Sequence, residues 1–113
     1  MITLHEYLME IGGTNHTPGL DPREIVLKGG YVCDMLSDVM GSAREGQVWI
    51  TIMKHLNTIA VASMTGVPAI ILSKGNVPEQ AVIDKANEEG VCICSSELDT
   101  FSLAGILYTL LQK

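Results

Sequence analysis

The chain has 113 residues, with seven basic and thirteen acidic side chains and a formal net charge of −6. This length is enough for one hydrophobic core, so we expect a single domain over residues 1–113. The share of hydrophobic residues is 47% but that of aromatic residues only 4%, which predicts an aliphatic core. The acidic balance argues against a nucleic acid polymer as partner, because phosphate binding requires a basic face.

The first 29 residues are less regular than the rest. Apolar residues at helical spacing predict a short helix over Thr3–Ile11, which the Gly12-Gly13 pair ends. For residues 14–30 we expect a loop with one short edge strand at Ile25–Leu27.

From residue 30 onward, short apolar runs alternate with helical stretches. The runs are rich in β-branched residues, which is typical of parallel strands covered on both faces. Strand starts recur at roughly 21-residue intervals, which suits βαβ crossovers. We predict strands at Tyr31–Cys33, Val48–Ile52, Ala69–Leu72 and Val91–Cys94, and helices within Asp34–Gly41 and over Leu56–Thr65, Pro78–Glu89 and Thr100–Leu111.

Helix ends and core residues can also be assigned from the pattern. We expect Asn76, with Glu79 three residues later, to cap the helix near Pro78, and Asp99 to cap the last helix. Cys92 and Cys94 lie on one face of a strand, where we expect reduced, packed thiols. Four methionines are predicted to fill the core, and the first two of them alternatively face a partner subunit: Met35, Met40, Met53 and Met64.

The uncharged run His55–Ser73 has nearly the length of a membrane span. Asn57 and the turn residues Gly66 and Pro68 interrupt it, so we interpret it as helix, turn and buried strand. The N-terminus has no basic start of the kind that begins a secretory signal. We therefore expect a cytoplasmic protein that does not contact a membrane.

Several catalytic motifs are missing. No lysine follows a glycine, which excludes the phosphate loop of P-loop kinases, and the glycine fingerprint of dinucleotide-binding folds and the nucleophile elbow are absent. A zinc site would require Cys92, Cys94 and a histidine to converge. We expect no catalytic residue, no metal and no cofactor; the enzymatic alternative is a hydrolytic site built from Thr51, His55 and Asp99.

In a parallel sheet, ligands bind beyond the carboxyl ends of the strands. We expect Lys74, His55 and free helix N-terminal amides to hold a small anion there. The competing interpretation is that Asp34, Asn76 and Asp99 serve only as helix caps and that His55 faces solvent. The polar residues at this edge are Asp34, Ser37, Asp38 and those of segments 51–57, 73–76 and 95–100.

Four segments carry a resemblance to a known family: GYVCDMLSDVMGSAREGQVWIT, HLNTIAVAS, AIILSKGNVPEQAVIDKANEEGVCI and DTFSLAG. They lie within the stretch Gly30–Tyr108, which resembles the DRTGG domain, a module similar to the N-terminal domain of HPr kinase/phosphorylase and found in some phosphotransacetylases and regulated inorganic pyrophosphatases. The chain is similar to the free-standing branch, in which this domain is the whole protein. The resemblance implies a three-layer α/β sandwich with a mostly parallel sheet of four to five strands, and homodimerisation. It does not imply kinase activity, which belongs to a separate P-loop domain.

The chain departs from the family pattern at the positions that give the domain its name. Ser73-Lys74-Gly75 replaces the expected Thr-Gly-Gly, and Met53 and Lys54 lie where the Asp-Arg pair is expected. The resemblance implies six candidate ligand-binding residues, Thr51, His55, Asn57, Gly75, Asp99 and Thr100. The charge argument adds Lys74.

Two functions remain in competition. The first is a non-catalytic regulatory module, acting as a homodimer, that senses a small anionic metabolite or a nucleotide at the carboxyl edge of the sheet. The alternative is a protein-interaction or assembly subunit of a metabolic enzyme complex, which binds no ligand and contacts its enzyme partner through the Met35–Met40 helix and the last helix.

Overall fold

A five-stranded sheet forms the centre of the molecule. The computed structural model describes residues 1–113, and its strand order is β2-β7-β6-β5-β4. Four strands are parallel, and β2 joins β7 in the antiparallel direction at one edge. The strands are β2 (Thr14–Asn15), β4 (Gly29–Val32), β5 (Gln47–Thr51), β6 (Ala69–Leu72) and β7 (Cys92–Ser95).

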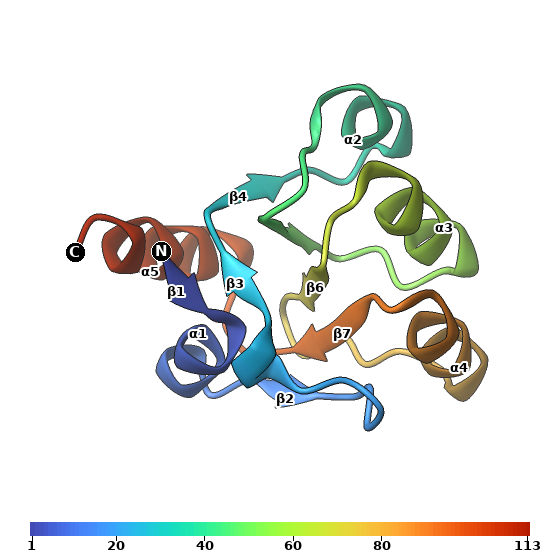
Figure 1. The fold of residues 1–113 in the computed structure, drawn as a ribbon, viewed down its shortest axis with the longest axis horizontal. Helices are drawn as coiled ribbons and strands as arrows, with labels where there is room; N and C mark the ends of the chain where they lie inside the picture. The colour runs from blue at the N-terminus through green and yellow to red at the C-terminus, as the bar shows by residue number, and fades with distance from the viewer.

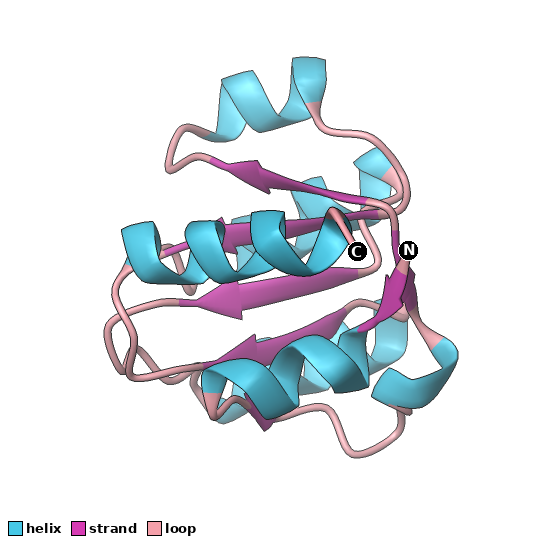
Figure 2. Cartoon of the chain, turned by 90° about the vertical axis from the view of Figure 1, so that its left-hand side faces the viewer, coloured by secondary structure: helices cyan, strands magenta, loops and turns pink.

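Helices cover both faces of this sheet. Helices α2 (Leu36–Ser42), α3 (Leu56–Thr65) and α4 (Gln80–Glu89) form one layer, and α1 (Leu4–Ile11) and α5 (Thr100–Leu111) form the other (Figure 1). The two chain ends lie on the α1/α5 side (Figures 1 and 2). The predicted three-layer α/β fold with a mostly parallel five-stranded sheet is therefore confirmed.

Each layer of helices has its own apolar core, because successive strand residues point to opposite faces. Val48 and Ile50 of β5 pack with α1 and α5, whereas Trp49 packs with the other layer. The indole of Trp49 donates a 2.8 Å hydrogen bond to the Cys33 carbonyl. On the opposite side the buried Tyr7 hydroxyl donates to the Leu103 carbonyl at 2.7 Å, and burial raises the pKa of this phenol well above its usual range.

The N-terminal segment is more ordered than its sequence indicates. Strand β1 (Ile2–Thr3) pairs with β3 (Val26–Leu27) in a small second sheet, and a 3₁₀ turn, η1 (Pro22–Glu24), precedes β3. The predicted loop over residues 14–30 is wrong at its start, where β2 extends the main sheet. This strand has only two residues and no apolar alternation, and its partner β7 is remote in sequence, so no local pattern marks it.

Two expected helix caps are absent. The side-chain amide of Asn76 donates a 2.7 Å hydrogen bond to the Ser73 carbonyl, and α4 begins after Glu79 with no side-chain cap. Asp34 does not cap α2, which starts after Met35. Asn76 instead stabilises its own turn through a carbonyl three residues away, and Asp34 accepts bonds from Thr51 and Ile52 at the end of the neighbouring strand. The Asp99 cap of α5 is confirmed, with a 2.7 Å bond from the Ser102 amide.

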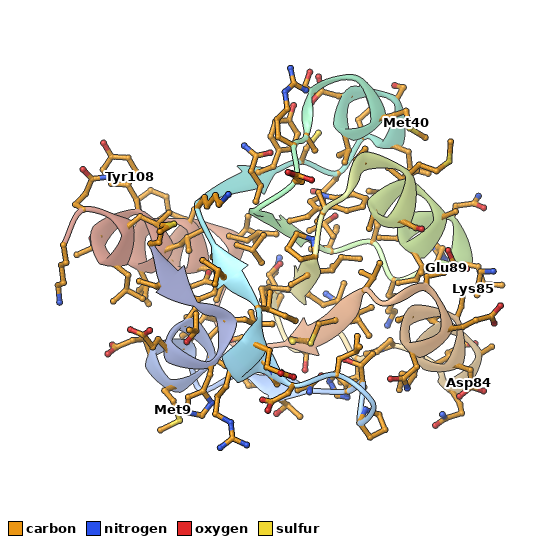
Figure 3. The ribbon with its side chains drawn as sticks, in the orientation of Figure 1. Met9, Met40, Asp84, Lys85, Glu89 and Tyr108 are labelled. Atoms are coloured by element: carbon orange, nitrogen blue, oxygen red, sulfur yellow. The ribbon has the colours of Figure 1, made fainter.

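The prediction that the methionines fill the core is wrong at three of four positions; the alternative for Met35 and Met40, contact with a partner subunit, stays a prediction. Met35, Met40 and Met64 are 61%, 41% and 72% exposed, and only Met53 packs against a core. Figure 3 shows Met40 at the outer side of α2. The two strand cysteines do pack as expected: they are buried and free, with sulfur atoms 3.7 Å apart. No helix is long and apolar enough to cross a membrane.

Candidate functional site

The loops that leave the carboxyl ends of β4, β5, β6 and β7 form one edge of the sheet, and all seven predicted site residues lie in or next to them. The structure divides these residues into three groups. One is a hydrogen-bonded brace between the loops after β4 and β5, one is a tight turn after β6, and one lines a cavity between two helices.

The brace is built around Thr51. This residue is fully buried at the end of β5, and its hydroxyl donates to the Asp34 carboxylate at 2.6 Å. The same carboxylate oxygen accepts the Ile52 amide at 3.1 Å, and the Thr51 hydroxyl accepts the Met53 amide at 3.2 Å. Thr51 therefore connects the loops after β4 and β5, and its hydroxyl is directed at protein groups.

The turn after β6 involves Lys74 and Gly75, both with positive φ, at 61° and 71°. Their amides donate to the carbonyls of Leu98 and Ser96 at 2.8 and 2.9 Å, which anchors the turn to the loop after β7. A side chain at Gly75 would be strained by this φ, and its Cβ would lie 2.7 Å from Glu97 Oε2. These contacts make the turn a structural connection between two neighbouring loops.

Asp99 and Thr100 complete this turn region. The Thr100 hydroxyl lies 2.8 Å from the Ser73 hydroxyl. Hydrogen bonds from Ser102 hold the pKa of Asp99 below its usual range, and the positive charge of Lys74 lowers it further. Lys74 and Asp99 thus partly neutralise each other, which reduces the attraction of the turn for an anion.

The third group lies in a cavity of about 350 Å³ between the starts of α3 and α4. This volume is at the lower end of the range for small-molecule sites. Of the predicted site residues it contains His55 and Asn57; Thr51, Lys74, Gly75, Asp99 and Thr100 do not line it. The complete lining is Lys54, His55, Leu56, Asn57, Glu79, Ala81 and Val82.

Two helices begin at this cavity without a side-chain cap. His55 precedes α3 and Glu79 precedes α4; their backbone carbonyls accept bonds from the first turn, but neither side chain accepts one. The first backbone amides of each helix therefore have no partner within the chain: Leu56, Asn57, Gln80 and Ala81. Free amides at a helix N-terminus attract anions, because donors and helix dipole both favour negative charge.

Side chains give the cavity a mixed character. Lys54 and His55 offer a cation and an imidazole, Glu79 opposes them with a carboxylate, and Leu56 and Val82 provide apolar surface. Lys54 and Glu79 were not among the predicted site residues. Lys54 directly precedes the predicted site residue His55 in the sequence, which is a usable signal. The position of Glu79 follows only from the packing of α4 beside α3.

The architecture defines an open α/β domain with a ligand-sized cavity at the carboxyl edge of its sheet. The DRTGG domain family model matches residues 22–110, most of the chain, and the chain belongs to this family. A comparison with curated protein sequences finds no significant match.

A solved structure has the same fold. It contains the CBS and DRTGG domains of the regulatory region of a Clostridium perfringens pyrophosphatase, in complex with its activator, diadenosine tetraphosphate. The TM-score is 0.76 at 16% sequence identity, and the match covers 93% of this chain. It covers 45% of the pyrophosphatase chain, so the present chain corresponds to less than half of that regulatory region.

Proposed function

We propose that the protein is a non-catalytic regulatory module that binds a nucleotide in the cavity between the starts of α3 and α4. The observation that carries this proposal is the pair of uncapped helix N-termini at one cavity, with Lys54 and His55 beside them. The free amides and these two side chains would hold phosphate oxygens. In this proposal residues 1–113 form a single regulatory domain.

The rest of the cavity suits the remainder of a nucleotide. Leu56, Ala81 and Val82 offer apolar surface for a base, and Asn57 and Glu79 offer acceptors for ribose hydroxyls. Glu79 also disfavours negative charge next to it, so the phosphate group would lie on the Lys54 and His55 side of the cavity. Membership of the DRTGG family, and the activator-bound regulatory region that has the same fold, support a regulatory role.

The direct test is thermal unfolding and titration calorimetry with AMP, ATP and diadenosine tetraphosphate. A bound nucleotide raises the melting temperature, because it binds the folded state only. We expect Lys54→Gln to weaken binding at least several-fold and His55→Ala to weaken it as well.

Lys74→Gln is the matched control, because it removes the same charge from the same edge of the sheet without touching the cavity. We expect it to bind nucleotide as the parent chain does. If Lys74→Gln abolishes binding and Lys54→Gln does not, the ligand lies at the turn after β6, and the cavity assignment is wrong. Absence of any shift with all three nucleotides contradicts the sensing function.

A second candidate function is a subunit that assembles with an enzyme and binds no ligand. It is supported by the exposed side chains of Met35, directly before α2, and Met40 on α2. Recovery of only the protein itself in affinity purification from its native cell would count against this function. In either function we propose that the protein acts as a homodimer.

A further inference from the structure

Helix α5 carries no charged side chain from Thr100 to Gln112, although the chain as a whole has a net charge of −6. Its inner face is buried through Leu103 and Leu107. On its outer side Phe101 is 88% and Tyr108 is 68% exposed, and Figure 3 shows Tyr108 projecting away from the molecule. A helix that is apolar all round is normally covered all round.

The outer face of α5 has a defined pattern. Phe101 and Tyr108 are seven residues apart, and Ala104 and Gly105 lie between them on the same side of the helix. A Cβ at Gly105 would meet no atom within 4 Å, so the packing of one chain does not require glycine at this position. Glycine inside a helix is unfavourable relative to alanine, and close approach of another backbone is one reason to keep it.

An apolar groove runs beside this face. It has a volume of about 180 Å³ and is lined by Gly30 and Val32 of β4 together with Ala104, Leu107 and Tyr108 of α5. β4 is the edge strand of the sheet, and Figure 2 shows it alongside α5 with no helix over it on this side. Val32 is 48% exposed, and no charged residue lines the groove.

We propose that a second copy of this chain covers this surface, with the two α5 helices antiparallel about a two-fold axis near Gly105. Two chains of charge −6 repel each other, and an interface between two α5 helices brings no charged residue of one helix against the other. The two-fold places Phe101 of each copy beside Tyr108 and the groove of the other. The exposed aromatic ring and the groove that receives it lie on one surface, as an isologous interface requires.

The size of this surface sets the strength of the dimer. The exposed parts of the two aromatic side chains amount to roughly 300 Å² per copy, against about 800 Å² per partner in a standard interface. Val32, Ala104 and Gly105 add to this area. The dimer is therefore a reversible one that dissociates on dilution. This interface rests on the proposed function in one respect, the homodimer, and its formation does not require a bound nucleotide.

Molecular mass measured by light scattering and sedimentation over a wide range of concentration tests the proposal. We expect a monomer–dimer equilibrium that Phe101→Glu shifts at least tenfold toward the monomer. Met64→Glu is the matched control, because it adds the same charge to an exposed apolar side chain on α3; it leaves the equilibrium unchanged. Circular dichroism confirms that both variants are folded.

The double variant Phe101→Glu/Tyr108→Lys tests the antiparallel arrangement. In that arrangement the new carboxylate of one copy lies opposite the new ammonium group of the other, so the double variant dimerises more strongly than Phe101→Glu alone. A double variant weaker than Phe101→Glu overturns the antiparallel pairing, and a parent chain that is monomeric at every concentration, or a dimer that Phe101→Glu leaves intact, overturns the proposal. Nucleotide titration of the Phe101→Glu monomer reports separately on the cavity, so failure of the dimer and failure of nucleotide binding are distinguishable.

Discussion

The hydroxyl of Thr51 donates a 2.6 Å hydrogen bond to the carboxylate of Asp34, and this bond joins the loops after two neighbouring parallel strands. Thr51 is completely buried, whereas Asp34 is reached from solvent. The brace lies directly before the loop that carries Lys54 and His55, so it positions one side of the cavity.

Removal of the brace should destabilise the fold. Asp34→Ala leaves the buried Thr51 hydroxyl and the Ile52 amide without their acceptor, and we expect a loss of about 1–2 kcal/mol in the free energy of unfolding. Chemical denaturation measures it. Asp34→Asn keeps an acceptor oxygen and should lose less; equal losses in the two variants would show that the hydrogen bonds contribute little.

Gly30 is required for the packing of α5 on the edge strand. A Cβ at this position would overlap Leu107 Cδ2, and Leu107 is buried in the core. We expect Gly30→Ala to cost about 1–3 kcal/mol in thermal or chemical unfolding, as overpacked cores do. Gly41→Ala, in a helical position with open space around the new Cβ, should instead stabilise the chain by up to about 1 kcal/mol. Destabilisation by both variants would indicate a general intolerance of alanine.

His16 should make stability depend on pH in the weakly acidic range. Partial burial lowers the pKa of His16 from its ordinary value of 6.5, and its Nε2 lies 2.7 Å from the Ser95 hydroxyl. Because the unfolded chain then takes up a proton more readily than the folded chain, the contribution of His16 to stability is complete above pH 6.5 and decreases as the pH falls below it.

Denaturation between about pH 7 and pH 5 should therefore show a falling stability in the parent chain and a flatter profile in His16→Gln. Carboxylates with a lowered pKa, such as Asp99, take up protons only at lower pH and do not contribute to the change in stability between about pH 7 and pH 5. Parallel profiles for the two chains would assign the pH dependence to other groups.

The capping role of Asp99 can be separated from a ligand-binding role. Asp99→Ala removes the acceptor of the Ser102 amide, and we expect it to lower the free energy of unfolding, as the loss of an N-cap does. Asp99→Ser retains a capping oxygen without the charge and should unfold close to the parent chain. A nucleotide affinity that changes in Asp99→Ser but not in Lys54→Gln would place the ligand at the turn rather than in the cavity.

The elements that could be predicted from the sequence are those with local signals. Leu56–Thr65 and Thr100–Leu111 are helices at the predicted bounds, because a glycine in the left-handed region ends the first and Asp99 caps the second. Ala69–Leu72 is a strand at its predicted bounds, because a short, continuous apolar run is typical of a central parallel strand that is buried on both faces.

The candidate site was less predictable. The family resemblance indicated His55 and Asn57 as ligand candidates, and both line the cavity. The resemblance also selected Gly75 and the charge argument selected Lys74, but their left-handed backbone serves the turn after β6. Glu79 lacked any local signal, since its place beside His55 is created by the packing of α4 against α3.

The short strand β2 protects the outer edge of β7, and with α1 it belongs to the segment that precedes the family match at residue 22. A chain shortened to that boundary would lose the Tyr7 anchor and expose the β7 backbone along an apolar strand. Open strand edges of this kind recruit further strands from other molecules. The N-terminal residues thus act as a guard against aggregation, and the shortened chain should form insoluble or high-mass species where the full chain stays dispersed.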